Sequence, residues 1–339
     1  MIPYEVVVRR EAHGSYLKRN PQLEKGTVFP KLVLEFFLKT SDNNWQGTPI
    51  PKDDPFVQFT ESGVELYLPD VPIPNQKPFL VLSDYPLKGQ PEHFEQIAKI
   101  AKQTFLVLEK AWQMENARLV DFKVEFGFNH KGDLLLADVI DNDSWRVVQN
   151  QQYIDKQAYR DGQSIDAVTQ LYQRVSFLTD HFKLPNQQLI LWRGSDKDDL
   201  EPFLQQFKRF ESPYLKSTII TSSAHKNPIG SYLTFQDNVK QVSDSVLISY
   251  IGRSNGAEPT LAANATIPVI TTPAGGDQFH EDVWSSLKEP SATPVMTVME
   301  PQNAVLAAMQ ILACRNPLLY MQLRMEQEER LTNVVEFGE

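Results

Sequence analysis

Two carboxylates and a lysine, Glu125, Asp138 and Lys123, lie near one another in the sequence and have the chemistry of a metal and phosphate site. Like charges that face each other across paired strands are destabilising, so two facing carboxylates call for a cation. A hard cation such as Mg²⁺ is held by one or two carboxylates together with substrate phosphates. Lys123 leaves the same strand face as Glu125 and is placed to hold a phosphate beside the metal. The spacing also leaves open an exposed hairpin whose charges are solvated.

A β-hairpin must position these side chains. Apolar and charged residues alternate through 120–126, which is the period of a half-buried strand. The tetrapeptide Asn-His-Lys-Gly at 129–132 is a turn signal, and the apolar run 134–140 is interpreted as the returning strand. Folding the chain at that turn predicts that Glu125 lies roughly opposite Asp138, with the two side chains about 5 Å apart.

Three polar motifs at strand ends in the second half of the chain form another candidate site. Short apolar runs alternate there with helical segments, which predicts a parallel sheet with helices on both faces. Ligands bind outside the carboxyl ends of the strands in such a sheet. The motifs at 193–198, 222–226 and 252–256 follow the first three strands, and the first is expected to open a helix whose N-terminus suits a phosphate. His225, in the second motif, can move a proton near neutral pH.

The remaining histidines and the single cysteine predict no further site. The other five histidines are expected on surfaces, in turns or in helices, and no pair has metal-ligand spacing, so no zinc site is predicted. Cys314 lies in an apolar helical stretch and is interpreted as a core residue rather than a nucleophile. A single cysteine permits no internal disulfide, which fits a reducing compartment.

Composition limits the classes of function. The 339 residues favour two domains, and a hydrophobic fraction of 41% is enough to bury their cores. The formal net charge of −10 argues against non-specific nucleic-acid binding and against an anionic membrane surface as partners. No apolar run is long enough to span a bilayer, and the N-terminus has no signal-peptide pattern, so a cytoplasmic protein is expected.

The pattern of elements changes at Leu184-Pro185-Asn186, which is the expected domain boundary. The predicted domains are 1–183, with antiparallel strands and helices, and 187–331, with a parallel sheet and C-terminal helices. The helices expected in the first domain cover 92–113 and 164–182. Strands are expected at 1–10, 33–38, 64–68 and 79–82 in the first domain, and at 189–192, 217–221, 246–251, 268–271 and 295–298 in the second.

Four segments carry a resemblance that covers residues 1–180: VVVRREAHGSYLKR (6–19), LVDFKVEFG (119–127), ADVIDNDSWR (137–146) and DKQAYRD (155–161). They resemble SAICAR synthase, the ATP-dependent ligase of purine biosynthesis. The resemblance implies that this part is the family's C-terminal lobe, an antiparallel sheet with helices, and that ATP and Mg²⁺ are its cofactors. The implied reaction activates the carboxylate of CAIR as an acyl phosphate, which the amine of aspartate then attacks to give SAICAR.

The same resemblance implies roles for single residues. Glu125 and Asp138 match the acidic residues that serve Mg²⁺ and ATP, and Lys123 matches the catalytic lysine between them. Arg9 and Ser15 match residues that hold the ribose phosphate and carboxylate of the substrate. The residues that match the lining of the nucleotide and aspartate pocket are Asp143, Arg146, Lys156 and Arg160.

Five segments carry a second resemblance over 186–315: RGSDKDD (193–199), SSAHK (222–226), GRSNG (252–256), NATIPVI (264–270) and DVWSSLKEPSA (282–292). They resemble the AIR carboxylase domain, and the pairing of SAHK with GRSNG is similar to the class II enzymes that use CO₂ directly, as in fused animal-type proteins. The resemblance implies a flavodoxin-like three-layer α/β/α domain that converts AIR and CO₂ to CAIR without a cofactor. It also implies a homo-oligomer, an octamer built through this domain.

The roles implied in the second domain follow the three motifs. Gly194, Ser195 and Asp198 match residues that hold the ribose phosphate. The reaction centre is matched by Ser223, His225 and Lys226, with His225 as the proton shuttle. The loop that closes on the CO₂ end is matched by Arg253, Ser254 and Asn255.

Three departures from the family patterns matter. The ligase family has an N-terminal lobe with a Gly-rich phosphate loop, and this chain is expected to lack it because its first residues match the strand that follows that lobe. The aspartate-binding loop is only loosely matched by 39–42 and 52–55. Lys197 replaces the second serine of the GSxSD motif, and Ala292 stands where a glycine often follows Pro-Ser. Because of these departures, the alternative to an active enzyme is a catalytically incomplete remnant that binds nucleotide or scaffolds an oligomer. An oxidoreductase is disfavoured because GxGxxG is absent.

Overall fold

The computed structural model divides the chain into two compact units, residues 1–182 with 324–339 and residues 183–323. The structure describes residues 1–40, 43–51, 54–60, 63–82, 91–160, 162, 164–252, 257–275 and 281–336, without the side chains of 91–92, 159–160, 282 and 332–336.

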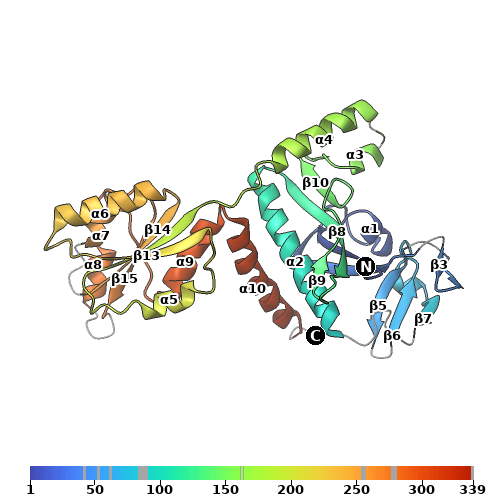
Figure 1. The fold of residues 1–339 in the computed structure, drawn as a ribbon, viewed down its shortest axis with the longest axis horizontal. Helices are drawn as coiled ribbons and strands as arrows, with labels where there is room; N and C mark the ends of the chain where they lie inside the picture. Colours follow the sequence, from blue (N-terminus) through green and yellow to red (C-terminus); the bar gives the residue numbers. More distant parts are fainter. Residues whose placement is uncertain are drawn as a thin grey trace. The chain divides into compact units, whose positions relative to one another are not determined.

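The first unit is built on an antiparallel sheet that has nine strands in the described part of the chain (Figure 1). The strand order is β11-β10-β8-β1-β2-β5-β6-β7, and β9 pairs with β8. The strands are β1 (Tyr4–Glu11), β2 (Val28–Leu38), β5 (Phe56–Thr60), β6 (Gly63–Tyr67), β7 (Leu80–Leu82), β8 (Arg118–Phe128), β9 (Leu134–Leu136), β10 (Trp145–Gln149) and β11 (Gln152–Tyr153), with a separate pair β3 (Asn44–Trp45) and β4 (Thr48–Pro49). The helices are α1 (Ser15–Arg19), α2 (Pro91–Met114), α3 (Gln157–Arg160) and α4 (Ile165–Thr179), with a 3₁₀ turn η1 (Ile73–Asn75).

The two faces of this sheet differ because side chains alternate along each strand. One face packs against α2, where the rings of Tyr4 and Phe94 lie 5.6 Å apart and those of Phe105 and Phe122 lie 5.5 Å apart. The other face carries most of the charged side chains of β1, β2 and β8, together with a few apolar ones such as Val7 and Phe37. The sheet therefore has an apolar face that forms the core and a charged face that is free to form a site.

The predicted hairpin exists, but its register corrects the facing of the two carboxylates. Phe126 pairs with Leu136, and the amide of Ala137 donates to the carbonyl of Glu125 at 2.9 Å. Glu125 is thus opposite Ala137, one residue before Asp138, and a shift of one residue puts a side chain on the other face. The returning strand also ends at Leu136 instead of residue 140.

The early end of β9 has a local cause. After Ala137 the chain leaves the ladder for a turn in which Ser144 Oγ donates to the carbonyl of Val139 at 2.8 Å and accepts from the amide of Asp141 at 3.1 Å. Short polar side chains that bond to nearby backbone groups compete with strand pairing. An apolar pattern in the sequence does not reveal that competition.

The second unit is a five-stranded parallel sheet with the order β13-β12-β14-β15-β16. Leu189, Leu191 and Ile248 pack with α5 and α9 on one face, while Ile190, Trp192 and Leu247 pack with α6 and α7 on the other (Figure 1). The expected α/β/α layers are confirmed. The elements are β12 (Gln187–Arg193), α5 (Glu201–Phe207), β13 (Leu215–Thr221), α6 (Pro228–Gln241), β14 (Ser245–Gly252), α7 (Ala257–Ala262), β15 (Val269–Ala274), α8 (Asp282–Leu287), β16 (Met296–Thr297), α9 (Pro301–Ala313) and α10 (Pro317–Glu336).

The C-terminal region differs from expectation in two ways. Residues 324–339 group with the first unit, whereas the predicted second domain extends to 331. Cys314 is exposed instead of buried, because it follows the last buried turn of α9. Among the helices that the structure describes, none has the length and apolar character needed to cross a membrane.

Candidate functional site

The charged face of the first sheet is hollowed into a cavity of about 290 Å³. Side chains from β1, β8, β10 and the segments after β1 and β11 line it. Six residues assigned by resemblance to the ligase site meet there from four separate segments: Arg9, Ser15, Lys123, Asp143, Arg146 and Lys156. Of the other three residues assigned to that site, Glu125 and Asp138 do not line the cavity, and the side chain of Arg160 lies outside the described part of the structure.

Arg9 is the most buried cation of this cavity, with 3% of its side chain exposed. Its Nε donates to Glu35 at 2.7 Å and its Nη1 donates to Asp121 at 2.5 Å, while Nη2 lies 3.5 Å from Ser15 Oγ. Burial alone lowers the pKa of Arg9, but the carboxylates of Asp121 and Glu35 outweigh it and raise the pKa above its ordinary value. Arg9 is therefore a permanent charge that two carboxylates hold in place.

Arg146 is fixed from two sides. Its Nη1 donates to the same oxygen of Asp121 that Arg9 uses, at 2.6 Å. Gly14 lies against the guanidinium so closely that an added Cβ would collide with it, and the φ of Gly14 is +58°. A glycine is required here by both the backbone conformation and the space, and the motifs in the sequence did not single it out.

Lys123 belongs to a cluster of alternating charges on the same face. Its Nζ donates to Glu5 at 2.8 Å, and Lys39 Nζ lies 3.2 Å from Glu125 and 3.9 Å from Glu5. Strand register explains the cluster, because Glu5 pairs with Glu125 and Val7 with Lys123. Lysine side chains compensate the facing carboxylates Glu5 and Glu125, so the positive charge that was expected from a metal is supplied here by the protein.

The described residues do not offer a preformed magnesium site. Glu125 is paired with Lys39, and Asp138 is exposed with its Oδ1 accepting from the amide of Val139 at 2.8 Å. Neither residue lines the cavity, and within the described ranges no three His, Cys, Asp or Glu side chains gather as metal ligands. The donor set therefore does not fit a cation held by the protein alone.

The far wall of the cavity comes from the segment after β11. Lys156 Nζ donates to Asp143 at 2.6 Å, and both side chains are partly exposed. Asp155 beside them is buried and accepts from the amides of Val147 and Gln157 at 2.6 and 2.7 Å. Burial raises the pKa of Asp155 to about 6, against the lowering effect of these two hydrogen bonds.

His13 is a second residue whose environment the sequence did not reveal. It is buried, its Nδ1 lies 2.5 Å from the hydroxyl of Tyr153, and its Nε2 lies 3.2 Å from Glu11. His13 lies in the bend after β1, within the expected range of surfaces, turns and helices, but the bend folds back on β11 and buries the side chain. These contacts tie the segment that holds Gly14 and Ser15 to the segment that leads to Asp155.

In the second unit the three polar motifs follow β12, β13 and β14, which are neighbours in a parallel sheet. Asp198 accepts from the amide of Ser195 at 2.9 Å, which closes the Gly194–Asp198 turn. Helix α5 begins only at Glu201, so the turn does not open a helix directly, contrary to expectation. The remaining members of the predicted loop, Arg253, Ser254 and Asn255, lie outside the described residues.

The reaction centre predicted in the second unit lies at the end of β13. The amides of Lys226 and Asn227 donate to the carbonyl of Ser223 at 3.1 and 2.9 Å, forming a turn that leaves His225 and Lys226 exposed. Lys197 is also exposed and does not fill the turn closed by Asp198. Ala292 has a φ of +63°, so the backbone keeps the conformation that suits the glycine expected there.

Comparisons with known proteins agree with the resemblances found for the two halves of the chain. The model of the SAICAR synthetase family matches residues 1–60 and 76–176, and that of AIR carboxylase matches 189–333. The chain thus has both domains of a fused enzyme class that acts in de novo purine biosynthesis.

Similar full-length proteins show which family the chain belongs to. The chain is 35% identical over 346 residues to the probable multifunctional protein ADE2 of Caenorhabditis elegans, covering 98% of this chain and 75% of the relative. It is 32% identical over 338 residues to the bifunctional phosphoribosylaminoimidazole carboxylase/phosphoribosylaminoimidazole succinocarboxamide synthetase of Homo sapiens, covering 96% and 73%. The chain belongs to this bifunctional family.

Two solved structures resemble single parts of the chain. A SAICAR synthetase (type 2) in complex with ADP is 26% identical with a TM-score of 0.39, over 52% of this chain and 64% of that chain. The PurE of Treponema denticola is 24% identical with a TM-score of 0.41, over 44% of this chain and 95% of that chain.

Proposed function

We propose that the first unit ligates aspartate to CAIR at the cavity on its charged face, using ATP and Mg²⁺, and that the second unit makes CAIR from AIR and CO₂ at its strand-end loops. The observation that supports this most is the meeting of six family-matched side chains in one cavity. In the ligase reaction, the CAIR carboxylate takes the terminal phosphoryl group of ATP. The aspartate amine then displaces phosphate, giving SAICAR, ADP and phosphate.

The cations of the cavity fall into two roles. Arg9 and Arg146 share Asp121 and are largely buried, so they fix the shape and charge of the floor. Lys123 and Lys156 are 45% and 40% exposed, and each has one carboxylate partner. We infer that these lysines exchange those partners for the phosphate and carboxylate groups of substrates. Catalysis of this kind rests on positioning and on charge neutralisation.

Magnesium enters this proposal only together with the substrate. Glu125 and Asp138 are the family-matched carboxylates for it, but the register does not bring them together and neither lines the cavity, so phosphate oxygens of the substrate would have to be ligands as well. When bound, it would offset charge on the transferring phosphoryl group. The aspartate site stays a prediction: residues 41–42 and 52–53 of its loosely matched loops lie outside the described residues, and Asp54 lines the cavity.

In the second unit, we propose that His225 moves the proton at the carbon of AIR that is carboxylated, with Ser223 and Lys226 beside it. The turn closed by Asp198 would hold the ribose phosphate, and no cofactor is needed. Exposed His225 at the end of β13, adjacent to the turn after β12, supports this arrangement.

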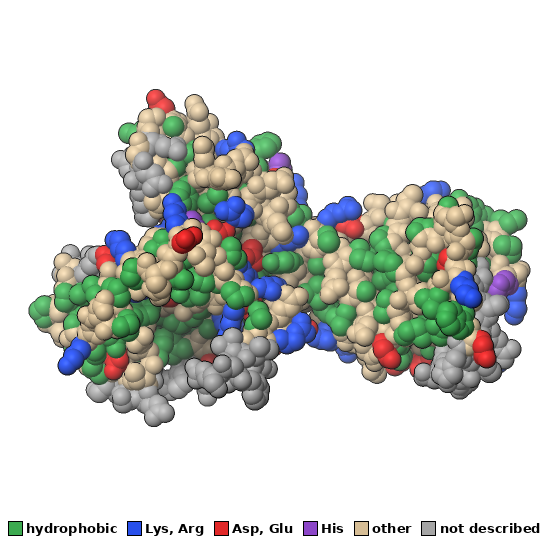
Figure 2. Space-filling view, turned by 180° about the vertical axis from the view of Figure 1, so that it is seen from behind, with side chains coloured by type: hydrophobic (Ala, Val, Ile, Leu, Met, Phe, Trp, Pro, Cys, Tyr) green, Lys and Arg blue, Asp and Glu red, His purple; other side chains and the backbone are tan. Residues whose placement is uncertain are grey.

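A homo-oligomer, with an octamer as the expectation by resemblance, would form through the second unit. Hydrophobic side chains are exposed there, including Ile219 on the edge strand β13 and Ile229 and Leu233 on α6. Figure 2 shows further hydrophobic side chains on one face of this unit. Light scattering that finds only monomers would contradict the assembly. A cytoplasmic location remains a prediction.

Two assays test the activities. Purified chain with CAIR, ATP, Mg²⁺ and aspartate should form SAICAR, and chain with AIR and bicarbonate should form CAIR. We expect Lys123→Met to lower kcat/KM of the first reaction at least roughly a hundredfold, and His225→Ala to abolish the second while sparing the first. Absence of both products, with CAIR still bound in calorimetry, would favour the nucleotide-binding remnant, and absence of binding would reject both.

A further inference from the structure

Strands β1 and β2 lose their regular pairing beside the cavity. Arg9 pairs with Val33 and Glu11 pairs with Val28, so β1 advances by two residues while β2 advances by five. Residues 29–32 of β2 thus lie opposite Arg10 alone and form a bulge. A bulge of this kind leaves backbone groups without strand partners and re-aims the neighbouring side chains.

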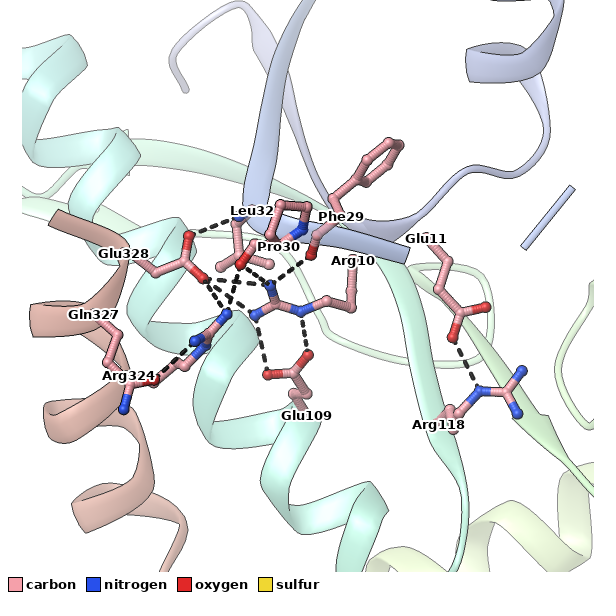
Figure 3. A network of polar contacts seen from close by, with 10 residues as sticks. All are labelled: Arg10, Glu11, Phe29, Pro30, Leu32, Glu109, Arg118, Arg324, Gln327 and Glu328. Carbon is pink, nitrogen blue, oxygen red and sulfur yellow. Dashed lines mark hydrogen bonds and ion pairs between the residues drawn. The ribbon is translucent and has the colours of Figure 1, made fainter. Parts of the chain in front are cut away.

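The middle of helix α10 supplies partners for that bulge (Figure 3). Glu328 Oε2 accepts from the amide of Leu32 at 2.6 Å, and Arg324 Nη2 donates to the carbonyl of Pro30 at 2.6 Å. The same arginine lies 3.2 Å from Glu328, whose side chain is only 3% exposed. Two side chains of the last helix thus complete the hydrogen bonding of a strand near the other end of the chain.

Arg10 links the bulge to the cavity strand. Its Nη1 donates to the carbonyl of Phe29 at 3.2 Å, both Nη atoms lie 3.3 Å from Glu328, and its Nε donates to Glu109 of α2 at 2.6 Å (Figure 3). Arg9 and Arg10 are consecutive in β1, so they leave opposite faces of the sheet. The contacts that fix Arg10 therefore fix the strand position from which Arg9 enters the cavity.

We propose that Glu328 is a positioning residue for the first cavity: through Arg10 and the bulge, it holds β1 so that Arg9 and Ser15 meet the substrate correctly. The proposal rests on the proposed ligase function, because it assigns a distant residue to the same site. On its β8 side, β1 stays regularly paired through Arg9 opposite Asp121, but its ladder with β2 is interrupted at Arg10, and there the contacts of Glu328 replace the missing pairing.

The test compares Glu328→Gln with Glu329→Gln. Glu329 is the exposed neighbour on α10, so this pair separates the bulge contact from a general change of helix charge. We expect Glu328→Gln to raise the KM for CAIR roughly tenfold with little change in kcat, because a misplaced binding group weakens substrate binding. Glu329→Gln should match the wild type.

Hydrogen exchange provides a readout that does not depend on the reaction. In Glu328→Gln, the amides of Leu32 and of residues 8–11 should exchange faster by roughly tenfold, because their local opening costs less free energy, while those of β12 and β14 keep their wild-type rates. If the wild type neither binds CAIR nor forms SAICAR, the proposed ligase function is rejected. Hydrogen exchange alone then tests whether Glu328 holds β1 in place.

Arg324→Gln is the milder variant if Glu328→Gln does not fold, since Arg324 is partly exposed. It should change the same two readouts in the same direction. Wild-type KM and wild-type exchange at β1 in these variants would overturn the proposal. A lowered melting temperature without either change would show a purely structural contact, which also overturns it.

Discussion

Asp155 shows how burial gives one carboxyl of the cavity an unusual role. It lines the site but accepts hydrogen bonds only from backbone amides, at 2.6 Å from Val147 and 2.7 Å from Gln157. These bonds connect β10, which carries Arg146, to the segment that carries Lys156. Asp155 is therefore best understood as a brace between the two walls that the substrate would contact.

The raised pKa of Asp155 predicts a pH dependence of stability. Its pKa is about 6 in the folded chain and about 3.8 ordinarily, so between these values the folded state binds more protons than the unfolded state. The contribution of Asp155 to the free energy of unfolding is then greatest below pH 4 and decreases, on the order of 3 kcal/mol in all, as pH rises to 6.

Denaturant unfolding measured from pH 4 to pH 7 checks this. Asp155→Asn should lose most of that decrease, whereas Asp143→Asn, at a partly exposed carboxyl of the same cavity, should keep it. Identical pH profiles for the wild type and Asp155→Asn would show that the carboxyl titrates normally.

At the scale of elements, the bend after β1 connects backbone conformation to the cavity. Gly14→Ala should weaken binding of CAIR and lower the free energy of unfolding by about 1–2 kcal/mol or more, because a side chain at positive φ is strained and the new Cβ would displace Arg146. Gly26→Ala is the matched control: Gly26 also has a positive φ, +85°, but nothing lies within 4 Å of the added Cβ.

Calorimetric titration with CAIR and denaturant unfolding separate the two effects. Both variants should lose stability, and only Gly14→Ala should lose affinity. Equal affinity in both would mean that Arg146 does not depend on Gly14 for its position.

Regular elements were predictable from the sequence where periodicity dominates. The helices expected at 92–113 and 164–182 correspond to α2 and α4, and the five strands of the parallel sheet were all expected. Side-chain periodicity could not give the register of β9, because a turn formed by Asp141 and Ser144 ends the strand early. Periodicity also could not show that Lys39, just after β2, lies beside Glu125 of β8, because the two residues are far apart in the sequence.

The residues of the candidate site were also predictable only in part. Residues in contiguous motifs, such as Arg9 and Ser15, could be assigned by resemblance and do meet in the cavity. Gly14, His13 and Asp155 lie in the same motifs but were assigned no role, since their importance depends on what lies against them after folding. A positive φ or a buried carboxyl is a property of the fold and is not written in residue type alone.

At the scale of the molecule, the first unit is made from two separate stretches of the chain. A fragment 1–182 should therefore be less stable than the same unit in the full chain, by about 1.5–3 kcal/mol, because the amide of Leu32 and Arg10 lose the carboxylate of Glu328 while Arg10 keeps Glu109. A synthetic peptide of residues 317–336 should restore part of that stability when it is added.

Fragment 183–323 is the reference, since it contains both of its own apolar clusters and should fold by itself. Chemical denaturation of each fragment, with and without the peptide, gives the comparison. A fragment 1–182 as stable as the unit in the full chain, and indifferent to the peptide, would contradict the prediction.

The contact between α10 and the β2 bulge also has a consequence for synthesis on the ribosome. Domains generally fold in the order in which they are made, starting from the N-terminal one. Here the strand that carries Arg9 and Arg10 emerges early, but Arg324 and Glu328 come after the whole parallel sheet. The second unit can thus complete its fold while the first, though begun earlier, still waits for its final helix.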